Sequence, residues 1–322
     1  MSDLVNPKAR ARQRFEQARR QAARAQMAAR LTGENLNLLP FEAIRANLQQ
    51  QNPYYRGVVQ VPLDAIVGSV GRYKTFTRKF LPLTNSIQDR WVAVDALAAR
   101  VGWPPVDLYQ VGNIFFVKDG NHRVSVAQQL KLATIEARVL AYPLDFEINP
   151  TDDLDHIFIQ LGEQNFLAKT KLADRFPEHN IRFTSPGRYT ELMAQIHDLQ
   201  QILAQIDDEA MDWETAVDAW YEMVYLPTVQ IIQDSTLLAD FPGRTEADLF
   251  AWLSQHRDRL QERYGNYENL ADLAQFLADE YREAGLPRLT RQVRRLLGAN
   301  SLPPLEKVAD LDDPLPSADD SN

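Results

Sequence analysis

The sequence contains no cysteine, which excludes disulfide bonds, thiolate catalysis and cysteine-ligated metal sites. It has no apolar run of the roughly 20 residues that a membrane-spanning helix needs, and its first residues form no apolar signal-peptide core. We therefore expect a cytoplasmic protein without a membrane partner. The five histidines show neither His-x-His nor His-Glu-x-x-His spacing, so the sequence predicts no metal site.

Two common catalytic signatures are also missing, the Gly-x-Ser-x-Gly elbow of hydrolases and the Walker phosphate loop. The composition itself, 45% apolar and 25% charged, is that of an ordinary globular protein, and 322 residues suffice for two domains. A net charge of −9 argues against electrostatic binding of nucleic acid by the whole protein. A protein with this net charge can still have a local basic surface that binds nucleic acid.

The most informative stretch lies between residues 106 and 140. Asn113 follows Gly112 between two runs rich in β-forming residues, which indicates a hairpin. At Asp119-Gly120 the apolar period changes from 2 to 3.6, which indicates that a strand gives way to a helix. The pattern thus predicts three strands, at residues 106–111, 114–118 and 134–140. A helix that ends near residue 130 lies between the second and the third strand.

The strand-to-helix turn is a candidate anion site. Backbone N–H groups at the start of a helix have no partner within the helix, and they lie at the positive end of its dipole. His122 and Arg123 follow Gly120 and would add donors or charge. The alternative from spacing alone is an ordinary helix start in which Asp119 or Asn121 caps the first turn.

The segment KDGNHRVSVAQQL resembles the strand–turn–helix signature of the ParB/sulfiredoxin-like domains, in which a Gly-x-(His/Arg)-Arg turn holds nucleotide phosphates. VPLDAIVGSVGR resembles the entry strand and first loop of that family, and residues 86–100 resemble the helix that follows. The resemblance covers about residues 57–142. It implies an α+β protein in which a ParB/sulfiredoxin-like mixed αβ domain follows a basic helix and precedes a mostly α-helical domain.

Composition shifts suggest the limits of these parts. A Pro/Asp-rich connection begins at Tyr142-Pro143, helical patterns dominate after it, and the last stretch is acidic and rich in Pro and Ser. The aromatic cluster between Trp213 and Tyr225 has helical spacing, which favours a core. The predicted parts are a basic N-terminal arm and linker (1–56), the ParB/sulfiredoxin-like domain (57–148), a helical domain (149–301) and an acidic disordered tail (302–322).

The resemblance implies a phosphate pocket between the turn and a glycine-bearing loop at residues 68–74. Glycines there would let the backbone approach a ligand, and the loop contains positive charge. The implied ligand is a nucleoside di- or triphosphate with Mg²⁺. The predicted binding residues are Gly120, Asn121, His122, Arg123, Ser69, Gly71 and Arg72.

Departures from the family pattern bear on catalysis. Sulfiredoxins place a cysteine where this chain has Asn121, so sulfinic acid reductase activity is ruled out. ParB proteins have Glu-Arg-Arg after the glycine, where this chain has Asn-His-Arg. The free-serine kinases need a carboxylate base in the first loop, and residues 68–74 contain none. The catalytic residues are therefore unknown, with Asp119 and His122 as the candidates.

The N-terminal segment at residues 7–31 is basic and helical, with Glu16 as its one acidic residue and a thin apolar stripe at Phe15, Ala18 and Ala22. One interpretation is an arm that binds DNA or another anionic surface. The other is a solvated helix that docks on the protein's own acidic surface. The first interpretation assigns nucleic-acid binding to Arg10, Arg14, Arg19, Arg20 and Arg24.

Three hypotheses about function remain. The favoured one is a nucleotide-phosphate-binding, ParB-like regulatory protein, associated with DNA through the basic arm as a transcriptional regulator or partition-like protein. The second is a Mg²⁺-dependent small-molecule kinase or nucleotide hydrolase, which the missing loop carboxylate disfavours. The third is a non-catalytic interaction module. Assembly into a homo-oligomer stays open under all three.

Overall fold

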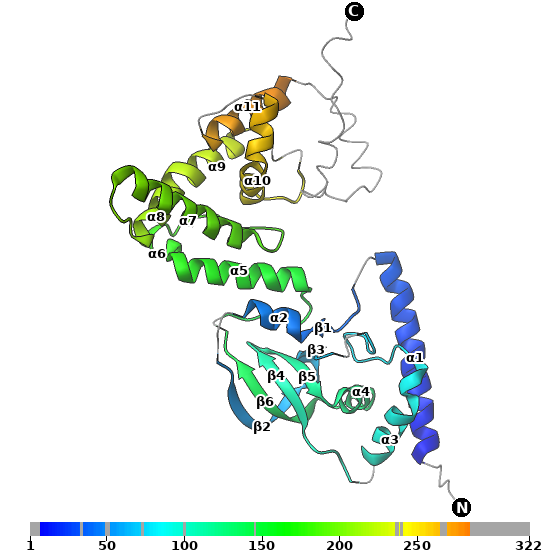
Figure 1. Ribbon diagram of the computed structural model, residues 1–322. Helices are drawn as coiled ribbons and strands as arrows, with labels where there is room; N and C mark the ends of the chain where they lie inside the picture. The colour runs from blue at the N-terminus through cyan, green and yellow to red at the C-terminus, as the bar shows by residue number, and fades with distance from the viewer. Residues whose placement is uncertain are drawn as a thin grey trace, which may run out of the picture. The chain divides into compact units, whose positions relative to one another are not determined.

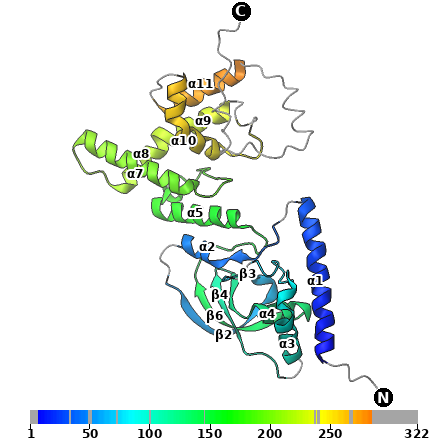
Figure 2. The same ribbon diagram turned by 45° about the vertical axis from the view of Figure 1, so that its right-hand side comes forward.

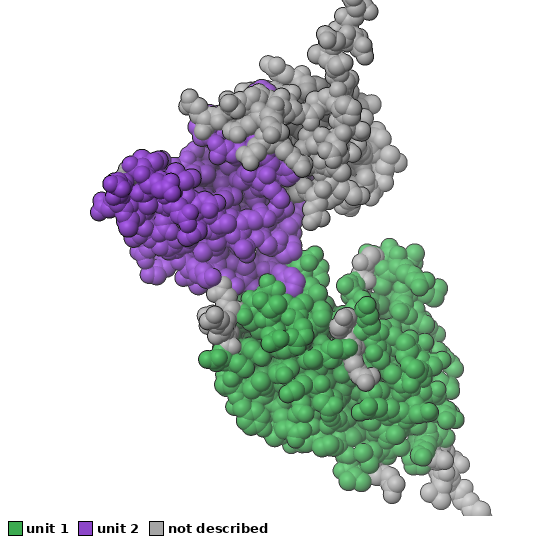
Figure 3. All heavy atoms as spheres, in the orientation of Figure 1, with its two compact units in different colours: residues 1–157 green, residues 158–322 purple. Residues whose placement is uncertain are grey.

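The computed structural model describes residues 7–32, 35–48, 52–71, 74–98, 101–144, 146–235, 238, 241–264 and 269–283. The chain forms two compact units, residues 1–157 and 158–322, coloured green and purple in Figure 3. The division falls beyond the expected limit at residue 148, and the N-terminal helix belongs to the first unit. None of the described helices combines the length and apolar character that crossing a membrane requires.

The first unit is built on a six-stranded mixed sheet with the strand order β1-β3-β5-β4-β6-β2. Strands β4 and β5 form the predicted antiparallel hairpin, while β3–β5 and β4–β6 pair in parallel. The predicted strands are confirmed, the third one extending two residues further than expected. The strand bounds are β1 (Leu39–Pro40), β2 (Tyr54–Pro62), β3 (Ile66–Ser69), β4 (Val106–Val111), β5 (Ile114–Asp119) and β6 (Thr134–Tyr142).

Helices cover both faces of this sheet (Figure 1). On one face Phe41 of α2 stacks on Tyr109, with 4.3 Å between the ring centroids. On the other face Trp91 of α3 is buried in a core that includes Val117 of the central strand β5. Strand side chains alternate between the two faces, so one strand contacts the helices on both sides of the sheet. The helices of the unit are α1 (Pro7–Thr32), α2 (Phe41–Asn47), α3 (Gln88–Ala98) and α4 (Asn121–Gln129), with short 3₁₀ turns at Leu63–Ala65 and Asn85–Ile87.

Gly68 lies inside β3 and serves strand packing. A Cβ atom at this position would overlap both the Phe116 ring and the carbonyl oxygen of Leu39. Only glycine therefore lets β1 approach β3 this closely. We expected the loop glycines to open the backbone toward a ligand, and Gly68 instead has this structural role.

Helix α1 runs along α3, as Figures 1 and 2 both show. Its apolar stripe of Phe15 and four alanines is buried, and Phe15 meets Trp91 edge-on at 5.5 Å between ring centroids. Arg14 makes a two-pronged ion pair with Asp95 of α3 at 2.5 and 2.7 Å. The small alanine side chains allow close approach, and Phe15 adds a large apolar side chain in contact with Trp91. The N-terminal arm is therefore a packed helix of the first unit.

The second unit is helical around its own apolar core. The predicted aromatic core is confirmed, because Trp220, Tyr221 and Tyr225 are all buried there, the last two within a short π-helical segment (Tyr221–Tyr225). The end of the predicted helical domain, from residue 284, and the predicted acidic tail lie outside the described residues. The described helices are α5 (Leu154–Thr170), which begins in the last residues of the first unit, α6 (Leu172–Arg175), α7 (Arg188–Asp207), α8 (Trp213–Trp220), α9 (Leu226–Asp234), α10 (Glu246–Tyr264) and α11 (Leu270–Glu283).

Candidate functional site

The site begins at the turn between β5 and α4. Gly120 has a φ of +109°, in the left-handed region, and a Cβ atom there would lie 2.6 Å from Val106 Cγ1. Both the dihedral angle and the packing therefore require glycine. The first helical hydrogen bond of α4 runs from the Val124 N–H to the Gly120 carbonyl at 3.0 Å. The N–H groups that precede it have no acceptor within the helix, so this end of α4 can bind an anion.

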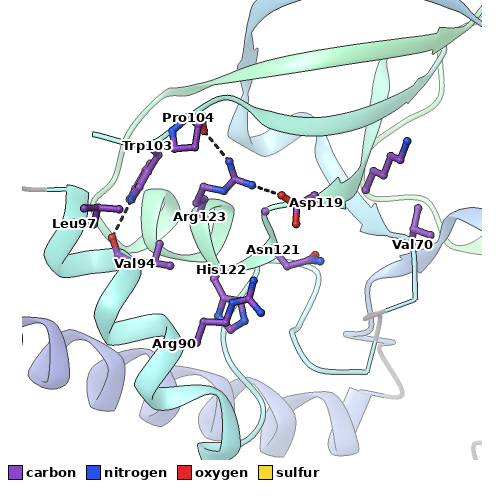
Figure 4. Close-up of a pocket in the computed structure, with 12 residues that line it drawn as sticks. Val70, Arg90, Val94, Leu97, Trp103, Pro104, Asp119, Asn121, His122 and Arg123 are labelled. Carbon is purple, nitrogen blue, oxygen red and sulfur yellow. Dashed lines mark hydrogen bonds and ion pairs between the residues drawn. The ribbon is translucent and has the colours of Figure 1, made fainter. Parts of the chain in front are cut away.

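A pocket of about 330 Å³ opens beside this turn (Figure 4). All four predicted turn residues, Gly120 to Arg123, line it. The rest of the lining comes from elements that sequence reasoning did not connect to the turn, chiefly α3 and the segment that precedes β4. These further lining residues are Val70, Arg90, Val94, Leu97, Trp103, Pro104, Lys118 and Asp119.

Arg90 is the cation best placed to meet an anionic ligand. It reaches from α3 toward the first turn of α4 (Figure 4), and it makes no hydrogen bond or ion pair with the described residues. Lys118, at the end of β5, adds a second positive charge and lies 5.4 Å from the centre of the Tyr109 ring. Arg90 carried no sequence signal, because its position on the solvent side of α3 reads as an ordinary surface arginine.

Arg123 is committed to the protein itself. Its Nη1 donates to the carbonyl oxygens of Pro104 and Pro105 at 2.8 and 2.9 Å, and its Nη2 forms an ion pair with Asp119. The guanidinium therefore clamps the segment before β4 onto the turn. We expected Arg123 to add donors and charge to a phosphate site, and three of its five N–H donors are already used within the protein. The same ion pair engages Asp119, one of the two catalytic candidates.

Asn121 is the side chain that most directly indicates a ligand. It is only 7% exposed and lines the pocket, yet its Oδ1 has no hydrogen-bond partner among the described residues. An unsatisfied buried polar atom costs about 1–3 kcal/mol. A bound molecule that donates a hydrogen bond to this oxygen would remove that cost.

His122, the other catalytic candidate, is buried with its ring edge-on to Phe76 at 5.6 Å between centroids. It lines the pocket, but the ring also packs against the apolar interior of the unit. The His122 ring therefore forms part of the floor of the pocket and at the same time packs on the interior of the unit.

The glycine-bearing loop contributes less than expected. Ser69 is fully buried, and its hydroxyl donates to the Val117 carbonyl at 3.1 Å, so it serves the β3–β5 pairing. Gly71 is exposed and is not among the lining residues, whereas Val70 is. Arg72 lies outside the described residues. The second wall of the pocket is formed mainly by α3 and by Trp103-Pro104.

This second wall is apolar next to the charged turn. Trp103 is held in place by a hydrogen bond from its indole N–H to the Val94 carbonyl at 2.9 Å, and Leu97 and Pro104 extend the surface. The pocket can thus accept an anionic group at one end and a flat or apolar group at the other. Among the described residues, no cluster of three or more histidines and carboxylates is arranged to hold a metal ion.

No protein-family model matches the chain, and no curated protein matches it significantly.

Proposed function

We propose that the first unit is a ParB/sulfiredoxin-like sensor that binds a nucleotide through its phosphates at the start of α4. The observation that carries this proposal is the pocket at the start of α4, where Arg90 and Asn121 Oδ1 have no hydrogen-bond or ion-pair partner among the described residues. The first N–H groups of α4, which have no acceptor within the helix, border the same pocket. The resemblance of the turn to the phosphate-binding signature of that family supports the same conclusion.

The phosphate would lie over the first turn of α4. There it accepts hydrogen bonds from the backbone N–H groups and faces Arg90, which gains a charged partner that it lacks among the described residues. Arg123 has an indirect role, since its clamp on Pro104 and Pro105 holds the turn and the apolar wall together. In this arrangement Arg90 provides the binding charge and Arg123 the shape of the pocket.

The rest of the nucleotide would extend along the apolar wall. Trp103 and Leu97 offer a surface for the base, and Asn121 Oδ1 would accept a hydrogen bond from a sugar hydroxyl or a base amino group. The pocket chemistry therefore fits a molecule that combines a phosphate, a hydrogen-bond donor and a flat ring. A free inorganic phosphate would use only the first of these features.

We propose binding without rapid turnover, which favours a regulatory role. Phosphoryl transfer needs a base within hydrogen-bond reach of the attacking oxygen. Asp119 is the one carboxylate among the pocket-lining residues, and it is paired with Arg123. No specific observation favours the kinase or hydrolase alternative. Any Mg²⁺ would be bound mainly through the nucleotide's own phosphates.

The experiment is calorimetric titration of the full chain with ATP, ADP, CTP and pyrophosphate, with and without Mg²⁺. Replacing Arg90 with glutamine should weaken nucleotide binding roughly 10- to 100-fold, because charge-assisted hydrogen bonds contribute about 1.5–3 kcal/mol. The melting temperature should stay unchanged, since Arg90 makes no hydrogen bond or ion pair with the described residues.

The matched control is Arg45→Gln. Arg45 is an exposed arginine of α2 whose surface ion pair with Glu42 contributes little stability, and it does not line the pocket. Parent-like affinity is expected for this control. The proposal fails if the parent binds none of these compounds, or if Arg90→Gln and Arg45→Gln bind them equally well.

A further inference from the structure

We propose that the outward face of α1 is a docking surface for the phosphate backbone of double-stranded DNA. The helix carries seven arginines and one lysine against the single acidic residue Glu16. This surface is separate from the α4 pocket, and the proposal does not depend on nucleotide binding there. Five arginines of α1 are exposed, namely Arg10, Arg12, Arg20, Arg24 and Arg30.

The structure divides the arginines of α1 into two groups. Arg14 pairs with Asp95, and Arg19 donates to the Pro82 carbonyl at 2.9 Å and to Asn85 Oδ1 at 3.0 Å. These two arginines hold α1 on the unit, so they are removed from the predicted nucleic-acid-binding set.

The exposed arginines, in contrast, are available to a partner. The Arg20 side chain is 74% exposed, and its Nη2 lies 3.9 Å from Glu16 Oε2. An exposed ion pair at this distance is weak. The other four, Arg10, Arg12, Arg24 and Arg30, make no hydrogen bond or ion pair with the described residues. Because α1 is docked, these charges are displayed on a rigid rod about 39 Å long, at 1.5 Å per residue.

The charge of the protein is distributed unevenly between its two units. Residues 1–157 contain 20 Lys and Arg against 15 Asp and Glu, a net charge of +5. Residues 158–322 contain 15 against 29, a net charge of −14. The overall charge of −9 therefore conceals a positive unit whose basic residues are concentrated on α1. A polyanion that approaches this unit meets an attractive local field.

The physical character of the face favours duplex DNA over a membrane. Helices that lie in a bilayer surface insert an apolar face, and the apolar stripe of α1 is already buried against its own unit. Its two exposed large apolar side chains, Met27 and Leu31, lie near the C-terminal end of the helix. The rest of the exposed surface of α1 is rich in arginine and glutamine, with Lys8, Glu16 and alanines between them, and its many N–H donors suit phosphate oxygens.

The same face is poorly suited to single strands or to duplex RNA. Single-stranded nucleic acids are held by stacking on aromatic side chains, and the one aromatic residue of α1, Phe15, is buried. The exposed arginines are spread along the length of α1, from Arg10 to Arg30, and charges fixed on a rigid helix complement a stiff duplex. The major groove of B-form DNA is wide enough to admit part of a helix, whereas the narrow groove of A-form RNA is not.

The test is fluorescence anisotropy of the full chain with a labelled DNA duplex longer than α1, repeated over a series of salt concentrations. Each phosphate contact contributes about 0.9 to the slope of log affinity against log salt. The double variant Arg20→Gln/Arg24→Gln should therefore lower the magnitude of that slope by about 2. The matched control is Lys79→Gln/Lys169→Gln, which makes the same charge change at two exposed lysines outside α1 and should leave the slope unchanged.

Melting curves should be the same for the parent and both double variants, because all four substituted side chains are exposed. The proposal is overturned if the parent does not bind the duplex, or if the control loses as much affinity as the α1 variant. Tighter binding to single-stranded DNA, to duplex RNA or to vesicles of anionic lipid would also overturn it. Nucleotide affinity should be unaffected in the α1 variant, which separates this outcome from a failure at the pocket.

Discussion

At the scale of single residues, two arginines beside one turn have opposite roles. Arg123 is nearly buried and bonded to its own protein, whereas Arg90 is exposed and has no partner among the described residues. The adjacent His-Arg sequence drew attention to Arg123, and its position in the turn was correctly predicted. Its bonding partners could not be predicted, because the Pro104 and Pro105 carbonyls reach it only after β4 and β5 have paired.

This contrast predicts that Arg123→Ala destabilises the fold. The substitution leaves two carbonyl groups and Asp119 without their donor, and we expect a loss of about 1–2 kcal/mol in the free energy of unfolding. Urea denaturation measures that loss, with Arg90→Gln as the variant expected to retain parental stability. An Arg123→Ala protein as stable as the parent would show that the hydrogen bonds and the ion pair of Arg123 contribute nothing to the free energy of unfolding.

At the scale of elements, α1 packs on α3, which agrees with the interpretation that the N-terminal helix docks on its own protein. The contact is more apolar than that interpretation expected, because Phe15 and its neighbouring alanines are buried. The stripe is narrow because alanine is small, and small side chains are what allow two helices to pack closely. Asp95 is 1% exposed, and Arg14 is the ion-pair partner of this buried side chain.

We therefore expect Arg14→Met to destabilise the first unit by about 3–5 kcal/mol, because it leaves a buried carboxylate without a partner. The double variant Arg14→Met/Asp95→Leu should recover most of that loss, since both charges are then gone. A double-mutant cycle from chemical denaturation measures both effects. If the single variant is as stable as the parent, α1 does not depend on this ion pair.

At the scale of the whole molecule, each of the two units has its own main apolar core among the described residues. The second unit also contains a histidine whose pKa is shifted. Burial, and to a lesser extent the nearby Arg182, lower the pKa of His179 below its ordinary value of 6.5. Below pH 6.5 the unfolded chain then binds a proton that the folded unit does not, so acidification through this range favours unfolding.

The expected result is a loss of stability of the helical unit as the pH falls below 6.5, with a smaller loss in His179→Gln. Burial also raises the pKa of Glu163, which acts in the opposite direction: its stabilising contribution is lost as the pH rises through the raised value. Comparing variant with parent at each pH isolates the histidine. Calorimetric melting of both proteins at several pH values provides the measurement. Identical pH profiles for the two proteins would exclude His179 as the cause.

The sequence by itself determined the features that depend on neighbouring residues. The hairpin at Gly112-Asn113, the change from strand to helix at Gly120 and the buried aromatic cluster near Trp220 were all predicted, because periodicity and turn chemistry act over a few residues. The position of the turn before α4, where we propose that an anion binds, follows from the same local rules. The resemblance of this region to ParB/sulfiredoxin-like domains remains a prediction.

Only the tertiary structure decided which side chains remain available to a ligand or partner. Arg123, Ser69 and Arg14 are engaged by groups far away in the sequence, while Arg90 and Arg24 are left exposed and without an ion-pair partner among the described residues. Hydrogen-bond donors are limited in number, so a side chain that serves the fold has fewer donors left for a ligand. Whether a donor serves the fold or stays available to a ligand depends on which distant segments pack together, and no local sequence pattern contains this information.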